Sequence, residues 1–79
     1  MSTYRLMLVG DIGFQEFNYL SLRDAKKLAM CKTISFIHNN IDGNYKINMY
    51  WMAGFDWLEL RFSCGEYKDE RAAKIVPMY

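Results

Sequence analysis

The side chains best suited to catalysis or metal binding are one histidine, His38, and two cysteines, Cys31 and Cys64. A nucleophilic cysteine needs a histidine beside it and an acid that orients that histidine. We expect His38 instead on the apolar side of a strand, next to Ile47, as a packed histidine. No C-x-x-C or H-x-x-x-H spacing occurs, so a structural metal is not indicated. The sequence therefore predicts a protein that is not an enzyme, with no cofactor and two reduced thiols.

A glycine motif, Gly10-Asp11-Ile12-Gly13, matches the short G-x-x-G loop that clamps nucleic-acid backbone in one RNA-binding fold. In that fold the loop joins two helices and attracts phosphate. Here it lies between two alternating segments and carries the acidic Asp11. We therefore interpret it as a hairpin turn.

A basic cluster of three residues, Arg23, Lys26 and Lys27, falls on one face of a predicted helix. Such a cluster is usually a solvated surface. The alternative is a docking patch for phosphates or for an acidic protein surface, and both interpretations remain open at this stage.

Composition restricts the class of protein. The chain has 79 residues, 52% hydrophobic and 24% charged, so we expect one folded domain rather than a disordered tail. The net charge is +1, which gives no overall field for a polyanion or a membrane surface. No apolar run approaches the roughly 18 residues of a membrane span, and residues 1–9 are too short and too alternating for a signal peptide. We expect a cytoplasmic protein that does not bind a membrane.

Alternation and turn residues predict the elements. Residues 3–9 and 14–20 alternate on either side of the glycine motif and form a first hairpin. Ser21 then caps a helix whose apolar stripe includes Leu22, Ala25 and Leu28.

The boundary after Lys32 is the hardest to place, because residues 33–38 fit either a longer helix or a strand. Asp42-Gly43 is typical of a two-residue hairpin turn and favours the strand, with Ile34 opposite Trp51. The remaining pairs of this hairpin would be Phe36 with Met49, His38 with Ile47 and Asn40 with Tyr45.

The C-terminal third supplies the last strand and a tail. Residues 55–62 alternate and form a fifth strand. Residues 66–79 are interpreted as a charged turn or short helix followed by a tail, and Pro77 argues against a central strand there. The predicted fold is α+β, an antiparallel sheet of about five strands in the order ββαβββ with one helix on one face.

Aromatic residues exceed what one sheet face can bury, since two Trp, six Tyr and five Phe make up 16% of the chain. The alternation leaves several on the other face, listed here: Phe17, Tyr19, Tyr50, Phe55, Trp57, Tyr67 and Tyr79. Either the tail covers them, or they form a protein interface with the composition of a hot spot. Our candidate partner-binding residues are Tyr50, Phe55, Trp57, Arg23, Lys26 and Lys27.

The capped helix from Ser21 to Ala29, flanked by strands and followed by the Asp42-Gly43 turn, resembles the layout of small phage-encoded inhibitors, including some anti-CRISPR proteins. The resemblance implies a compact, non-enzymatic binding protein that occludes the surface of a host defence or regulatory complex, in the cytoplasm of the host cell if the chain is phage-encoded. It carries over no site residue, and the net charge of +1 departs from the acidic inhibitors that mimic nucleic acid. Two alternatives remain: a domain that binds RNA or single-stranded DNA, and a self-associating structural subunit that forms a homodimer.

Overall fold

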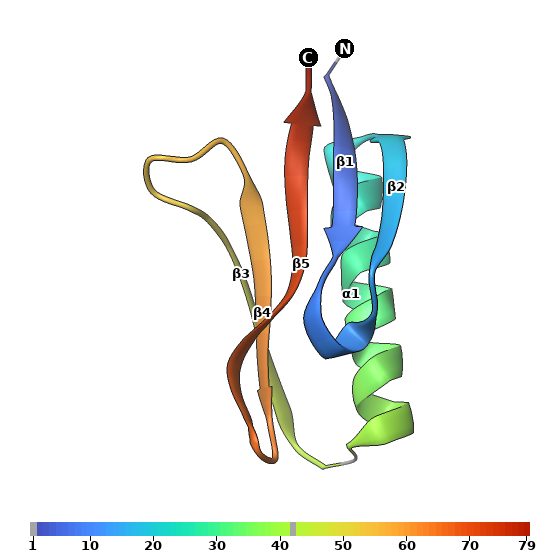
Figure 1. The fold of residues 1–79 in the computed structure, drawn as a ribbon, viewed down its shortest axis with the longest axis vertical. Helices are drawn as coiled ribbons and strands as arrows, with labels where there is room; N and C mark the ends of the chain where they lie inside the picture. Colours follow the sequence, from blue (N-terminus) through green and yellow to red (C-terminus); the bar gives the residue numbers. More distant parts are fainter. Residues whose placement is uncertain (1, 42) are drawn as a thin grey trace.

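The fold is one helix packed on a five-stranded antiparallel sheet (Figure 1). The computed structural model describes residues 2–41 and 43–79. Its elements are β1 (Thr3–Leu8), the short 3₁₀ helix η1 (Gly10–Ile12), β2 (Gln15–Leu20), α1 (Leu22–Asn40), β3 (Tyr45–Trp51), β4 (Leu58–Cys64) and β5 (Tyr67–Met78). The predicted α+β class and the ββαβββ order are confirmed.

The sheet is ordered β2-β1-β5-β4-β3, so the last strand of the chain lies at its centre. β5 pairs with β1 on one side and with β4 on the other. The two ends of the chain therefore lie close together, with Thr3 opposite Met78.

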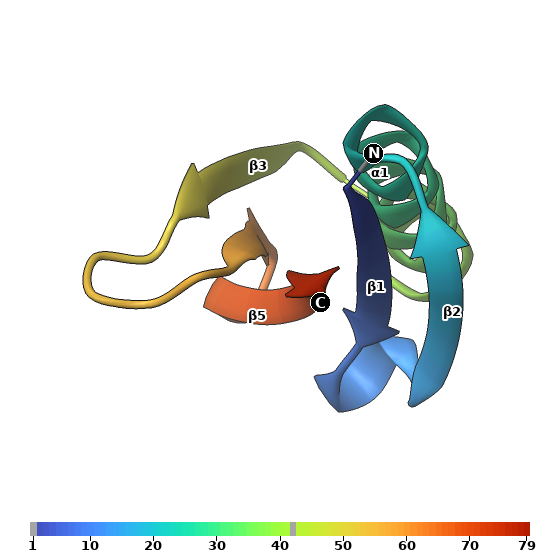
Figure 2. The same cartoon turned by 90° about the horizontal axis from the view of Figure 1, so that it is seen from above.

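The helix α1 lies on one face of the sheet and packs chiefly against β1 and β5 (Figure 2). Its buried residues, Ala25, Ala29, Thr33 and Ile37, recur at every fourth position and form one stripe. The two alanines bring the helix backbone close to the sheet. Their main partners in the core are Leu6, Leu8, Leu58, Leu60, Phe62 and Ile75.

The start of α1 is set by Ser21, as predicted. Its Oγ accepts a hydrogen bond from the backbone N–H of Asp24 at 3.1 Å. Because this bond satisfies one of the free N–H groups of the first turn, we expect Ser21→Ala to lower the free energy of unfolding by about 1 kcal/mol. Urea denaturation of the two proteins measures the difference, and an unchanged midpoint would contradict the role of the cap.

The prediction that residues 33–38 form a strand is wrong, because α1 continues to Asn40. Thr33 fits the helix since its hydroxyl donates to the carbonyl oxygen of Ala29 at 2.8 Å. Burial of Ile37 then outweighs the weak preference of β-branched residues for strands.

The predicted pairing of Ile34 with Trp51 is therefore also wrong, as are the other three pairs. The partner of Trp51 is Leu58 of β4, and the whole of β3 pairs with β4. His38 is exposed on the last turn of α1, with its ring edge-on to Tyr45, and does not lie beside Ile47 in a strand. The proposed Asp42-Gly43 turn includes Asp42, which lies outside the described residues.

The interpretation of residues 66–79 as a turn or short helix with a tail is also wrong. This segment is β5, and its Ala73 and Ile75 are buried under α1. Pro77 is accommodated because the pairing of β4 with β5 ends at Leu58 and Ile75, so β5 beyond that point has β1 as its neighbour. The strand expected at 55–62 begins at Leu58, after a loop that holds Phe55.

Candidate functional site

The candidate site is the sheet face that points away from α1, which we call the open face. Side chains alternate between the two faces of a strand. The residues that alternate in sequence with the buried leucines of β4 therefore lie on the open face. One row of paired residues crosses all five strands on this face: Tyr50, Glu59, Lys74, Met7 and Glu16. With neighbouring strands about 4.8 Å apart, the row is about 19 Å long, which is the scale of a protein contact surface.

The carboxylate of Glu59 is buried in the middle of the open face and binds several side chains around it. Glu59 is 0% exposed although no helix covers it. Its Oε2 accepts from Nε of Arg61 at 2.8 Å, and its Oε1 lies 3.2 Å from Nε of Arg71. The indole N–H of Trp57 also donates to Oε1, at 3.3 Å. Both carboxylate oxygens are therefore engaged by groups of the protein.

The charge of Arg61 is fixed by the same contacts. Its hydrogen bond to Glu59 raises the pKa of Arg61, against an opposing effect of burial. Arg61 also donates from Nη1 to the carbonyl oxygen of Asp69 at 3.0 Å. This arginine thus links β4 to the charged end of β5.

Three predicted site residues, Tyr50, Phe55 and Trp57, lie at one end of the open face, which we call the aromatic corner; Tyr50 pairs with Glu59, to which Trp57 donates. Phe55 and Trp57 stack with ring centroids 4.4 Å apart. Nζ of Lys74 lies 4.2 Å from the centroid of the Trp57 ring. Tyr50 is 40% exposed and Phe55 58%, whereas Trp57 is half-buried beneath these contacts. These contacts order the aromatic corner in the absence of a partner.

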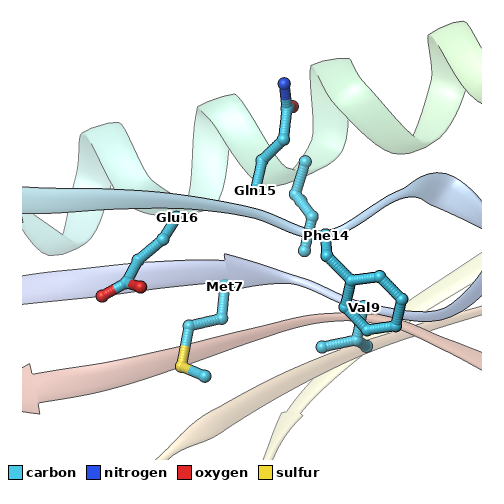
Figure 3. Close-up of a pocket in the computed structure, with 6 residues that line it drawn as sticks. Met7, Val9, Phe14, Gln15 and Glu16 are labelled. Carbon is cyan, nitrogen blue, oxygen red and sulfur yellow. The ribbon is translucent and has the colours of Figure 1, made fainter.

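A second apolar site lies at the other end of the open face, where a shallow hollow of about 330 Å³ is formed beside the turn between β1 and β2. Figure 3 shows Met7, Val9, Phe14 and Glu16 pointing away from α1, whereas Gln15 points toward the helix side. Phe14 is 84% exposed. The open face therefore has apolar groups at both ends and charged groups between them.

The three basic residues of the helix do not join this surface. Arg23, Lys26 and Lys27 lie on α1, which covers the opposite face of the sheet. Arg23 and Lys27 are exposed and Lys26 is half-buried. Lys27 lines a separate hollow of about 420 Å³ between α1 and β2. The structure thus divides the six predicted site residues into two groups.

Other predicted features are found apart from the open face. The glycine motif connects β1 to β2 through η1, as a hairpin connection would. Asp11 there accepts a hydrogen bond from the Tyr67 hydroxyl at 2.9 Å, which raises the pKa of Tyr67. Cys31 is exposed on α1 and Cys64 is buried in the core, and the two are not bonded to each other.

The aromatic surplus is only partly covered. Tyr19 is 76% exposed and Tyr79 fully exposed, while Phe17 and Tyr67 pack against the core. The Tyr79 hydroxyl donates to the carboxylate of Asp56, which ties the C-terminus to the loop beside the aromatic corner. Three further exposed aromatics, Phe14, Tyr45 and Trp51, are not among the residues that the sequence pattern left without cover.

Sequence reasoning also missed the charged centre of the open face. Glu59 and Arg61 are two residues apart in an otherwise apolar strand, and this opposite-charge pair on one face was a readable signal. Arg71 and Lys74 could not be found in the same way, because their segment was interpreted as a turn or short helix followed by a tail.

Among residues 2–41 and 43–79, no group of three or more histidine, cysteine or acidic side chains is arranged to hold a metal ion. Within the same residues, no helix is long and apolar enough to cross a bilayer. Comparisons of the chain with protein-family models, with curated proteins and with solved structures found no match.

Proposed function

We propose that this protein is a non-enzymatic binding module that occludes a surface of a larger protein through its open face. The observation that carries the proposal is the aromatic corner, where Phe55 and Tyr50 are exposed and Trp57 is half-buried and stacked on Phe55. Exposed aromatics that are already ordered lose little conformational entropy on binding. Aromatic residues with arginine and methionine nearby are also the composition of protein interfaces.

The chemistry of the open face supports binding rather than catalysis. Its buried carboxylate, Glu59, is saturated by Arg61, Arg71 and Trp57. A general base needs a free acceptor that reaches its substrate. His38 and Cys31 lie on the helix, on the other side of the sheet. On this proposal, and in keeping with the phage-encoded inhibitors that the chain resembles, the partner is a host defence or regulatory protein.

Single-stranded nucleic acid is the second candidate, because Lys74 lies over the Trp57 ring and two further cations, Arg61 and Arg71, bind the nearby Glu59. The contacts of these cations weigh against it. Two of them are paired with Glu59, and Lys74 together with Phe55 already occupies the Trp57 ring, on which a base would stack.

Affinity capture from host lysate tests the proposal with matched variants. We expect a protein retained by the wild type to be lost with the double variant Tyr50→Ala, Phe55→Ala, because those side chains make the contact. The control Arg23→Ala, Lys27→Ala changes two exposed residues of the helix and should retain it. Circular dichroism confirms that each variant is folded.

Two outcomes would contradict the proposal. Equal capture by the aromatic variant and the wild type would remove the aromatic corner as the site. Recovery of nucleic acid that is abolished by nuclease and falls steeply with salt would favour the second candidate.

A further inference from the structure

The strand β3 forms an edge of the sheet whose outer side has no partner strand within residues 2–41 and 43–79. It pairs with β4 over seven consecutive residues without a shift in register. The other edge, β2, is irregular: Tyr19 has φ of 61°, and its N–H donates to the sulfur of Met78 at 3.4 Å. Natural edge strands use such irregularities to prevent pairing with another chain, and β3 lacks them.

The backbone groups on the outer side of β3 can be assigned from the β3–β4 ladder. The N–H of Met52 donates to the carbonyl oxygen of Trp57 at 3.0 Å. Bonding alternates along an antiparallel pair, so the even-numbered residues of β3 bond to β4. The odd-numbered residues, Tyr45, Ile47, Met49 and Trp51, therefore direct their N–H and C=O groups outward.

The same four side chains lie on the helix side of the sheet, where α1 leaves the edge of β3 uncovered. Tyr45 remains 41% exposed and Trp51 51%, since α1 packs over β1 and β5. Ile47 and Met49 between them are half-buried. β3 thus combines unpaired backbone groups with an exposed apolar row.

We propose that β3 pairs antiparallel with β3 of a second copy, around a two-fold axis at Asn48. This register places Tyr45 opposite Trp51, Ile47 opposite Met49, and Asn48 opposite itself. The outward backbone groups of the odd residues then bond to one another across the whole strand. Aromatic and aliphatic pairs meet on the helix side.

Charge favours the same register. Lys46 is the one charged residue of β3, and its partner across the axis is Tyr50. A register centred on Lys46 would instead oppose two ammonium groups and leave residues 48–51 without partners in the second strand. Pairing around Asn48 aligns the two open faces side by side in one continuous sheet, so the homodimer would present two aromatic corners on one side.

Sedimentation equilibrium of the purified protein tests this pairing. We expect the wild type to sediment at twice the 9.4 kDa of the chain. Asn48→Lys and Asn48→Asp should each raise the dimer dissociation constant at least about tenfold, because each places like charges opposite one another at the axis. Asn48 is exposed and lies opposite Arg61 of β4, so circular dichroism of each variant must first show that the single chain is folded.

The mixture of the two variants provides the decisive control. Equal amounts of Asn48→Lys and Asn48→Asp should associate again, since a lysine then faces an aspartate. Gln15→Lys adds the same charge to the other edge strand, β2, and should leave the dimer intact. A wild type that sediments as a single chain at every concentration, or variants that both remain dimeric, would overturn the pairing. The sedimentation test does not depend on the result of affinity capture, so the two proposals can fail separately.

Discussion

Replacement of Arg61 by methionine is expected to lower the free energy of unfolding by about 3 kcal/mol. The reason is the fully buried carboxylate of Glu59, which would lose its 2.8 Å partner. Arg71 would remain, but it is 46% exposed and bonds at 3.2 Å to the other carboxylate oxygen. Urea denaturation of Arg61→Met against the wild type measures the loss.

The double variant Glu59→Leu, Arg61→Met separates the burial of a charge from the loss of packing. Apolar residues of similar size often replace a buried ion pair without loss, so we expect the double variant to be more stable than Arg61→Met alone. A loss below about 1 kcal/mol in Arg61→Met would show that Glu59 does not depend on this partner.

Replacement of Ile37 by alanine is the second large effect, with an expected loss of about 3 kcal/mol. Ile37 is 0% exposed and forms part of the stripe of α1 that faces the sheet. Ile34, one turn earlier on α1, lies outside the buried stripe, and Ile34→Ala should cost less than half as much. Thermal and urea unfolding of both variants provide the comparison.

This pair of variants also discriminates between helix and strand for residues 33–38. In a strand, Ile34 and Phe36 would face the core and Ile37 would face outward. A larger loss for Ile34→Ala than for Ile37→Ala would therefore contradict the helix.

Short-range signals in the sequence predicted much of the fold. The hairpin of β1 and β2, the Ser21 cap and the alternation that became β4 each depend on neighbouring residues, and all three are present. The face of β3 that carries Ile47 and Met49 was also assigned to the apolar side, although its partner strand was not the one expected.

Long-range choices were not predictable in the same way. The number of strands agrees, but for different reasons: residues expected as a third strand belong to α1, and β5 replaces them. Whether Ile37 continues a helix depends on the sheet below it, and whether Ala73 and Ile75 form a central strand depends on β1 and β4 on either side. No local sequence pattern identifies these neighbouring strands.

The candidate site, too, was predicted where it depends on local patterns and missed where it depends on strand pairing. Tyr50, Phe55 and Trp57 were predicted because strand alternation left them without cover, and the structure places them at the same end of the open face. The helix cluster around Lys27 was grouped with them by composition alone, and the sheet separates the two. Glu59 and Lys74 meet through the pairing of β4 with β5, which the sequence did not reveal.

One dissociation constant decides whether the aromatic corner is the contact surface. Once a captured partner is purified, its affinity can be measured for the wild type, for Phe55→Ala and for Lys27→Ala. We expect Phe55→Ala to weaken binding about 30-fold, the effect of losing a hot-spot side chain, and Lys27→Ala to leave it within about twofold. Unchanged affinity in Phe55→Ala, or a comparable loss in Lys27→Ala, would contradict the claim.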